Sequence, residues 1–136
     1  MLTLRPLFRR LGRAWSPAAR SERLAARHLR SRGYLILARN LRNRFGEIDI
    51  LAQGPDQRTL VVVEVKSSVS TRALAPRPEQ RVNHAKQRRL TLLACQVARR
   101  YRLTDRPIRF DVIGVDLVPH QPPALRHHLG AFTAKV

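Results

Sequence analysis

The sequence predicts a mixed α/β (α+β) domain, in which two long helices accompany a small set of strands. The first helix begins at Ser16, whose hydroxyl can cap it and which precedes a proline, and it ends at Gly33. Residues 46–66 are typical of two adjacent strands, because alternating residues and a run of valines flank a Gly-Pro-Asp turn sequence. Residues 78–101 carry apolar residues at helical spacing and predict the second helix.

The chain divides into three parts around these elements. Residues 1–15 form a basic N-terminal tail with amphipathic spacing, which could lie on a membrane, contact nucleic acid or be a simple tail. Residues 16–117 form one domain, and residues 118–136 are a C-terminal extension. Three histidines lie in this extension, and nothing in their spacing indicates a metal site.

Further strands are predicted over residues 33–40 and 107–117. A basic connection of residues 40–45 follows the first of them, and the arginines beside it suit either a solvated loop or bidentate phosphate contacts; they are Arg39, Arg42 and Arg44. Residues 67–78 lack periodicity and are predicted to be a mobile loop near the site. In the last strand, we expect Asp111 to form a salt bridge with Arg109.

Three charged side chains converge where the two central strands pair. Ile48 and Ile50 alternate with Asp49, and Glu64 and Lys66 share one face of the next strand, so pairing can bring the three charges together. Charged groups among valines lose hydration and need a partner. They could form a structural ion pair, or they could supply oxygen ligands for a divalent cation with a lysine beside them, as phosphodiester hydrolysis requires.

Charged residues of both helices face the same region. Glu22 lies in the middle of the apolar stripe of the first helix, where an arginine partner and a role at the site are equally compatible with the pattern. Lys86 lies on the apolar stripe of the second helix and either extends along the core edge or points at the site. Its neighbours Arg88 and Arg89 are predicted to form a phosphate-facing surface.

Composition favours a polyanionic partner. Lysine and arginine number 27 against 9 acidic residues, a net charge of +18, which suits nucleic acid or an anionic membrane surface. The single Cys95 excludes an intrachain disulfide, and no Cys/His spacing resembles a zinc site. No apolar stretch approaches the roughly twenty residues of a membrane span, so we expect a soluble cytoplasmic protein without stable membrane association.

The succession GYLILARN, RFGEIDI, VVVEVK, KQRRL and RFDV, preceded by a helix with Glu22, resembles the YraN-type family of small uncharacterised bacterial proteins. That family is similar in its core to the restriction-endonuclease-like PD-(D/E)XK nucleases, including Holliday-junction resolvases. The resemblance covers about residues 16–116 and implies an α-β-β-β-α-β core with helices flanking a mixed sheet. Ser21 departs from the family's usual glycine, and Ser67 and Ser68 replace its usual Thr-Arg, which concerns substrate contacts more than the metal site.

The resemblance also implies roles for particular residues. Asp49 and Glu64 would bind Mg²⁺ (or Mn²⁺) with the carbonyl of Val65, and Lys66 would orient or activate the attacking water. Glu22 would be an auxiliary acid, and Lys86 would take the place of a polar residue that related nucleases present from the following helix.

We therefore expect a Mg²⁺-dependent nuclease that acts on structured DNA in repair or recombination. The alternative is a nucleic-acid-binding protein that keeps the fold and the charge without turnover. A resolvase would need two active sites and hence a homodimer, and no feature of the sequence specifies one.

Overall fold

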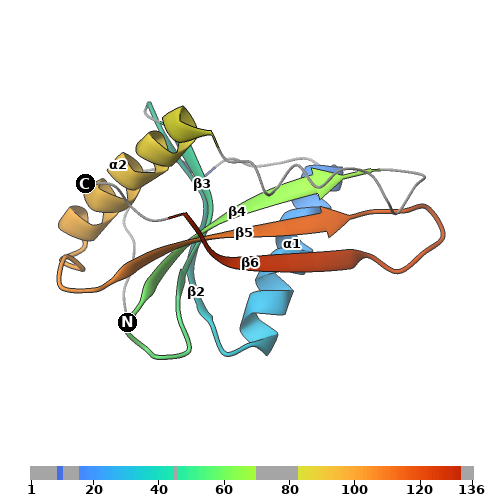
Figure 1. Cartoon of the computed structure of the whole chain (residues 1–136), viewed down its shortest axis with the longest axis horizontal. Helices are drawn as coiled ribbons and strands as arrows, with labels where there is room; N and C mark the ends of the chain where they lie inside the picture. The colour runs from blue at the N-terminus through green and yellow to red at the C-terminus, as the bar shows by residue number, and fades with distance from the viewer. Residues whose placement is uncertain (1–8, 11–15, 45, 70–82, 133–136) are drawn as a thin grey trace.

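The described part of the chain forms a six-stranded mixed sheet with one helix on each face (Figure 1). The computed structural model describes residues 9–10, 16–44, 46–69 and 83–132. Strands follow one another across the sheet in chain order, and all neighbours are antiparallel except β4 and β5. The elements are β1 (Arg9–Arg10), α1 (Pro17–Ser31), β2 (Leu35–Asn43), β3 (Gly46–Gln53), β4 (Leu60–Ser68), α2 (His84–Arg100), β5 (Ile108–Asp116) and β6 (Ala124–Phe132).

The expected α-β-β-β-α-β core is confirmed by α1, β2, β3, β4, α2 and β5. The parallel pair β4 and β5 is joined through α2, as a parallel connection requires. Ser16 caps α1 by accepting a hydrogen bond from the backbone N–H of Ala19 at 3.1 Å, and Gly33 follows the helix with φ at +86°. The predicted bounds of this helix are therefore confirmed.

Two separate hydrophobic clusters show that the helices cover opposite faces of the sheet. Val61 and Val63 of β4 pack with buried residues of α1, whereas Val62 packs with buried residues of α2. Successive side chains of a strand point to opposite faces, so β4 is buried on both. The continuous valine run in the sequence reflects this double burial.

The alternation of side chains breaks at Asp49 in β3. Ile48 packs in the cluster of α2 and Ile50 in the cluster of α1, so the expectation that both share one face is wrong. In β2, Arg39 pairs with Ile50 and Leu41 with Ile48, which places Asn40 opposite Asp49. Asn40 has a positive φ of 52°, which turns the chain at this point.

Three predicted boundaries need correction. Strand β2 continues to Asn43, so Arg42 lies within a strand rather than in a connection. Strand β4 continues to Ser68, because it pairs with β5 along its full length. Helix α2 begins at His84, since Asn83 is extended and caps it by accepting from the N–H of Lys86 at 2.9 Å. The rest of the predicted loop and the residues expected to open α2 lie outside the described residues.

The last strand, β6, was not predicted from the sequence. It pairs antiparallel with β5 and extends the sheet beyond the expected core. Strand β1, within the predicted tail, pairs with Leu41 and Arg42 of β2 at the other edge. Among the described residues, no helix is both long and apolar enough to cross a bilayer.

Candidate functional site

Asp49 lies where β3 and β4 separate. The ladder between these strands ends at the pair Ile50 and Val63, and beyond it the Oδ2 atom of Asp49 accepts a hydrogen bond from the N–H of Val65 at 2.8 Å. The side chain of Asp49 thus takes the place of the next backbone contact between β3 and β4. This arrangement fixes the carboxylate of Asp49 against β4 at Val65, one position before Lys66.

Three carboxylates gather around this point. Oxygen atoms of Glu22, Glu47 and Asp49 lie within 4.8 Å of one another. Glu22 is 3 % exposed and reaches the group from the buried face of α1, as its place in the apolar stripe allowed. Glu47 precedes Asp49 by two residues in β3.

The environment of Asp49 disfavours its charge. The pKa of Asp49 is raised from its ordinary 3.8 to about 7. Burial is the main cause, and the carboxylates of Glu64, Glu22 and Glu47 add to it, whereas the hydrogen bond from Val65 lowers the pKa. A divalent cation would remove this repulsion and bind the same oxygens, because hard cations prefer carboxylate ligands. The donor set therefore fits Mg²⁺.

Glu64 lies on the α2 side and is held by two lysines. Its Oε1 atom accepts a hydrogen bond from Nζ of Lys86 and lies 3.4 Å from Nζ of Lys66. Burial alone would lower the pKa of Lys86, but the hydrogen bond to Glu64 and the charge of Asp49 raise it above its ordinary value. Lys86 is therefore firmly protonated and points at the site, which was one of the two orientations that its place in the sequence allowed.

A cavity of about 220 Å³ connects Asp49 with Glu64. It is open to solvent on one side, and α2 forms one of its walls. Its lining combines charged groups with an apolar floor: Gly46, Glu47, Asp49, Glu64, Lys86, Arg89, Leu90 and Leu93. Acidic oxygens and cationic nitrogens thus meet in one hollow, which has room for a cation with its waters and for part of a phosphate group.

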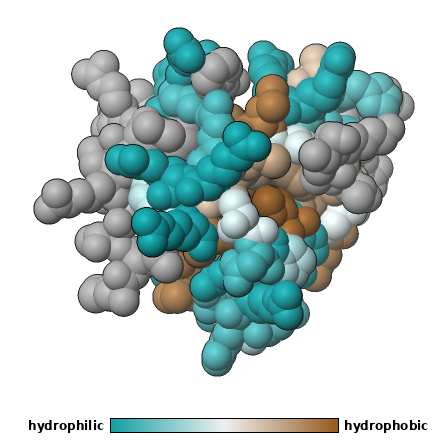
Figure 2. Space-filling view, turned by 90° about the vertical axis from the view of Figure 1, so that its left-hand side faces the viewer, coloured by the Kyte–Doolittle hydropathy of each residue, from teal (hydrophilic) through white to brown (hydrophobic). Residues whose placement is uncertain are grey.

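The five predicted arginines occupy different positions around this cavity. Arg89 lines it, whereas Arg88 is exposed on α2. Arg42 is exposed on β2 directly opposite Glu47, and Arg44 is exposed just beyond the strand. Arg39 is half-buried in β2. Figure 2 looks at the side of the molecule where α2 ends, and hydrophilic side chains surround a smaller hydrophobic area there.

Two of the serines that depart from the family pattern contact each other. Ser21 is fully buried in α1, and its hydroxyl donates a hydrogen bond to the hydroxyl of Ser67 in β4 at 2.8 Å. These residues directly precede Glu22 and directly follow Lys66. The bond therefore ties the helix that carries one acidic residue to the strand that carries the lysine.

The fold and the site define a small α+β domain with a partly buried group of carboxylates and lysines beside an open cavity. The chain belongs to the uncharacterised protein family UPF0102, whose family model matches residues 21–115. This confirms the resemblance to the YraN-type family.

Curated relatives support the same assignment over most of their length. A UPF0102 protein of Symbiobacterium thermophilum is 43 % identical over 113 residues, which are 83 % of this chain and 87 % of the relative. One from Rhodococcus opacus is 40 % identical over 84 % of this chain and 93 % of its own. One from Persephonella marina is 38 % identical over 75 % of this chain and 84 % of its own.

Proposed function

We propose that this protein is a Mg²⁺-dependent nuclease that hydrolyses phosphodiester bonds in structured DNA. The observation that carries the proposal is the position of Asp49 at the separation of β3 and β4, between buried carboxylates and the lysine-bound Glu64. The net charge of +18 supports a polyanionic substrate.

Different residues of the site would have different roles in the reaction. Asp49 would hold the cation, with Glu22 and Glu47 on one side and Glu64 across the cavity as further oxygen donors; the resemblance adds the carbonyl of Val65. A bound Mg²⁺ supplies a more acidic water and stabilises the charge that develops on the phosphate. Lys66 would orient the attacking water, which its Nζ atom at 3.4 Å from Glu64 supports.

Lys86 and Arg89 would act on the phosphate. Both side chains line the cavity, and both are cationic groups that can contact the oxygens of the substrate phosphate. Lys86 donates a hydrogen bond to Oε1 of Glu64. This oxygen would therefore coordinate a cation only when the hydrogen bond weakens. Lys86 would then be released toward the phosphate.

The same ion pairs favour a second function, the binding of nucleic acid without turnover. Glu64 is neutralised by two lysines, as in a structural ion network, and such a network needs no cation. Exposed arginines on β2 and α2 would then carry the binding. The two functions differ in what Glu64 does, and this makes Glu64 the residue to change.

Cleavage of labelled duplex, single-stranded, flapped and four-way-junction DNA with Mg²⁺ or Mn²⁺ tests the proposal. We expect cleavage by the wild type and its loss in Glu64→Gln and Lys66→Ala. Asp105→Asn is the matched control, because Asp105 is exposed in the turn before β5. Binding of these DNAs without cleavage by any variant would favour the second function.

A further inference from the structure

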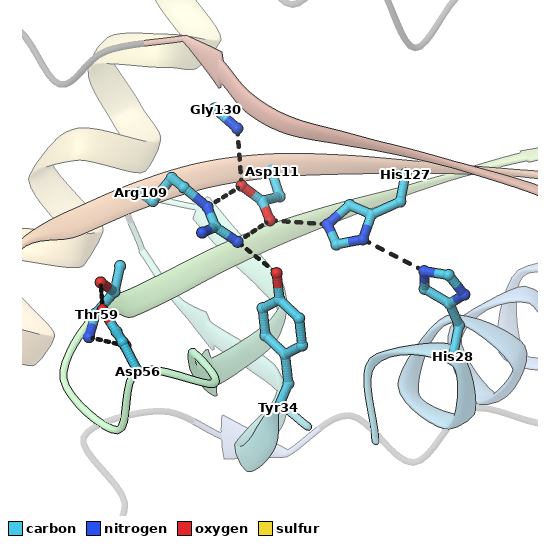
Figure 3. Close-up of polar contacts among 8 residues, drawn as sticks. All are labelled: His28, Tyr34, Asp56, Thr59, Arg109, Asp111, His127 and Gly130. Atoms are coloured by element: carbon cyan, nitrogen blue, oxygen red, sulfur yellow. Dashed lines mark hydrogen bonds and ion pairs between the residues drawn. The ribbon is translucent and has the colours of Figure 1, made fainter. Parts of the chain in front are cut away.

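A second polar cluster lies on the α1 face of the sheet, centred on the buried carboxylate of Asp111 (Figure 3). Arg109 donates to both of its oxygens at 2.8 Å, which confirms the expected salt bridge. The N–H of Gly130 donates to Oδ1 at 3.0 Å, and Nε2 of His127 lies 2.8 Å from Oδ2. Asp111 therefore joins β5 to two positions of β6.

These contacts fix the tautomer of His127. Arg109 donates to both oxygens of Asp111, so the carboxylate is ionised and only accepts hydrogen bonds. Nε2 of His127 must then carry a hydrogen. When the ring is neutral, its Nδ1 atom has a lone pair, and this atom lies at hydrogen-bonding distance from Nε2 of His28, at 3.3 Å.

The two facing nitrogens have the separation of neighbouring ligands on one metal ion. Zinc binds imidazole nitrogen at about 2.0–2.1 Å with tetrahedral angles, which places two such nitrogens about 3.3–3.4 Å apart. The observed 3.3 Å matches this value. The carboxylate behind His127 also fits, because a histidine that binds a metal usually donates its other N–H to a carboxylate.

We propose that His28 and His127 form a Zn²⁺ site that ties the end of α1 to β6. His28 is half-buried, so water can reach the ion and complete its coordination. Asp111 balances the charge of Arg109 beside the two rings.

The site differs in chemistry from the carboxylate group around Asp49. Two imidazoles suit zinc, whereas carboxylates suit Mg²⁺. The zinc site does not depend on the proposed nuclease function. Nothing in the sequence indicated it, because its two ligands lie 99 residues apart and meet only through the pairing of β5 with β6.

Zinc binding by untagged protein, in competition with a chromophoric chelator, tests the proposal. We expect one Zn²⁺ per chain in the wild type and at least about a hundredfold weaker binding in His28→Gln, since even partners of metal ligands contribute about 10- to 100-fold. Zinc should also raise the melting temperature of the wild type and leave that of His28→Gln unchanged.

Two further variants separate this site from other zinc-binding groups. Asp49→Asn removes a carboxylate of the other site, and His120→Asn removes an exposed histidine at a positive φ that asparagine tolerates. Both should keep the tight Zn²⁺. The proposal is overturned if the wild type yields all its zinc to the chelator, or if His28→Gln retains it. His28 is on the helix surface, so this variant should fold even where His127→Gln does not.

Discussion

The carboxylate of Asp49 accepts the backbone N–H of Val65 across the gap where β3 leaves β4. This single bond positions the acidic residue of one strand beside the Glu-Val-Lys segment of the next. Asp49 stands between Ile48 and Ile50, which pack on opposite faces of the sheet. Its side chain lines the cavity beside α2.

The raised pKa of Asp49 predicts that metal binding strengthens with pH. The carboxylate is protonated below about pH 7 and must lose its proton to bind Mg²⁺. Affinity for Mg²⁺, measured by calorimetry, should therefore rise between pH 6 and pH 8, by about tenfold for each unit below the pKa. An affinity independent of pH over this range would contradict the role of Asp49 as a ligand.

The same shift predicts how stability depends on pH without metal. A carboxyl whose folded pKa is above its unfolded value stabilises the fold below about pH 4, and this contribution is lost as pH rises to about 7. Asparagine does not ionise, so Asp49→Asn avoids the destabilisation that the charged carboxylate causes at high pH. In EDTA at pH 8 this variant should therefore increase the free energy of unfolding by about 1–4 kcal/mol. The difference should shrink toward pH 4, and denaturant unfolding at the two pH values measures it.

Replacing Lys86 should affect metal binding more than replacing its exposed neighbour. Lys86→Met removes a cation that is hydrogen-bonded to Glu64 and attracted by Asp49, so Mg²⁺ should bind several-fold more tightly. Arg88→Met removes an exposed charge of the same helix, which solvent screens. Equal changes in the two variants would show that Lys86 acts only through net charge.

The hydrogen bond between Ser21 and Ser67 should contribute about 1 kcal/mol to stability. Ser21→Ala removes the buried donor of this bond, whereas its acceptor Ser67 is exposed in β4. A double-mutant cycle with Ser67→Ala, measured by urea unfolding, should give a coupling of about 0.5–1.5 kcal/mol. Additive effects of the two substitutions would mean that the contact does not stabilise the fold.

Binding of duplex DNA should depend on salt through the arginines around the cavity. Replacing Arg89 by alanine should weaken binding and reduce the slope of log K against log[salt] by about 0.9 if it contacts one phosphate. Arg58, which is exposed in the turn between β3 and β4, provides the matched control and should leave the slope unchanged. Identical slopes for both variants would place the DNA elsewhere on the surface.

The central elements could be predicted because their signals are local. Ser16 and the following proline define the start of α1, and the valine run with Glu64 and Lys66 defines β4. The meeting of Asp49 with Glu64 followed from pairing these strands. The start of α2 was misjudged because a proline and an acidic residue gave a helix signal before the Asn83 cap.

Other features depend on contacts between distant parts of the chain. A period of two cannot reveal that Asn40 adopts a positive φ opposite Asp49, and this is why Ile48 and Ile50 were wrongly predicted to share one face. Strand β6 has a mixed pattern of arginine, histidines and glycine, and it forms because β5 offers a free edge. The partners of His127 become apparent only when that pairing is known.

The most direct test of the proposed nuclease function is a single-turnover cleavage assay of wild type and Asp49→Asn. The substrate would be the preferred DNA structure, in Mg²⁺ and with enzyme in excess. We expect the cleavage rate of Asp49→Asn to fall by at least about a hundredfold while DNA affinity is kept, since the loss of one strong electrostatic contribution to the transition state has that size. An unchanged rate in this variant would contradict the assignment of the active site to the cavity at Asp49.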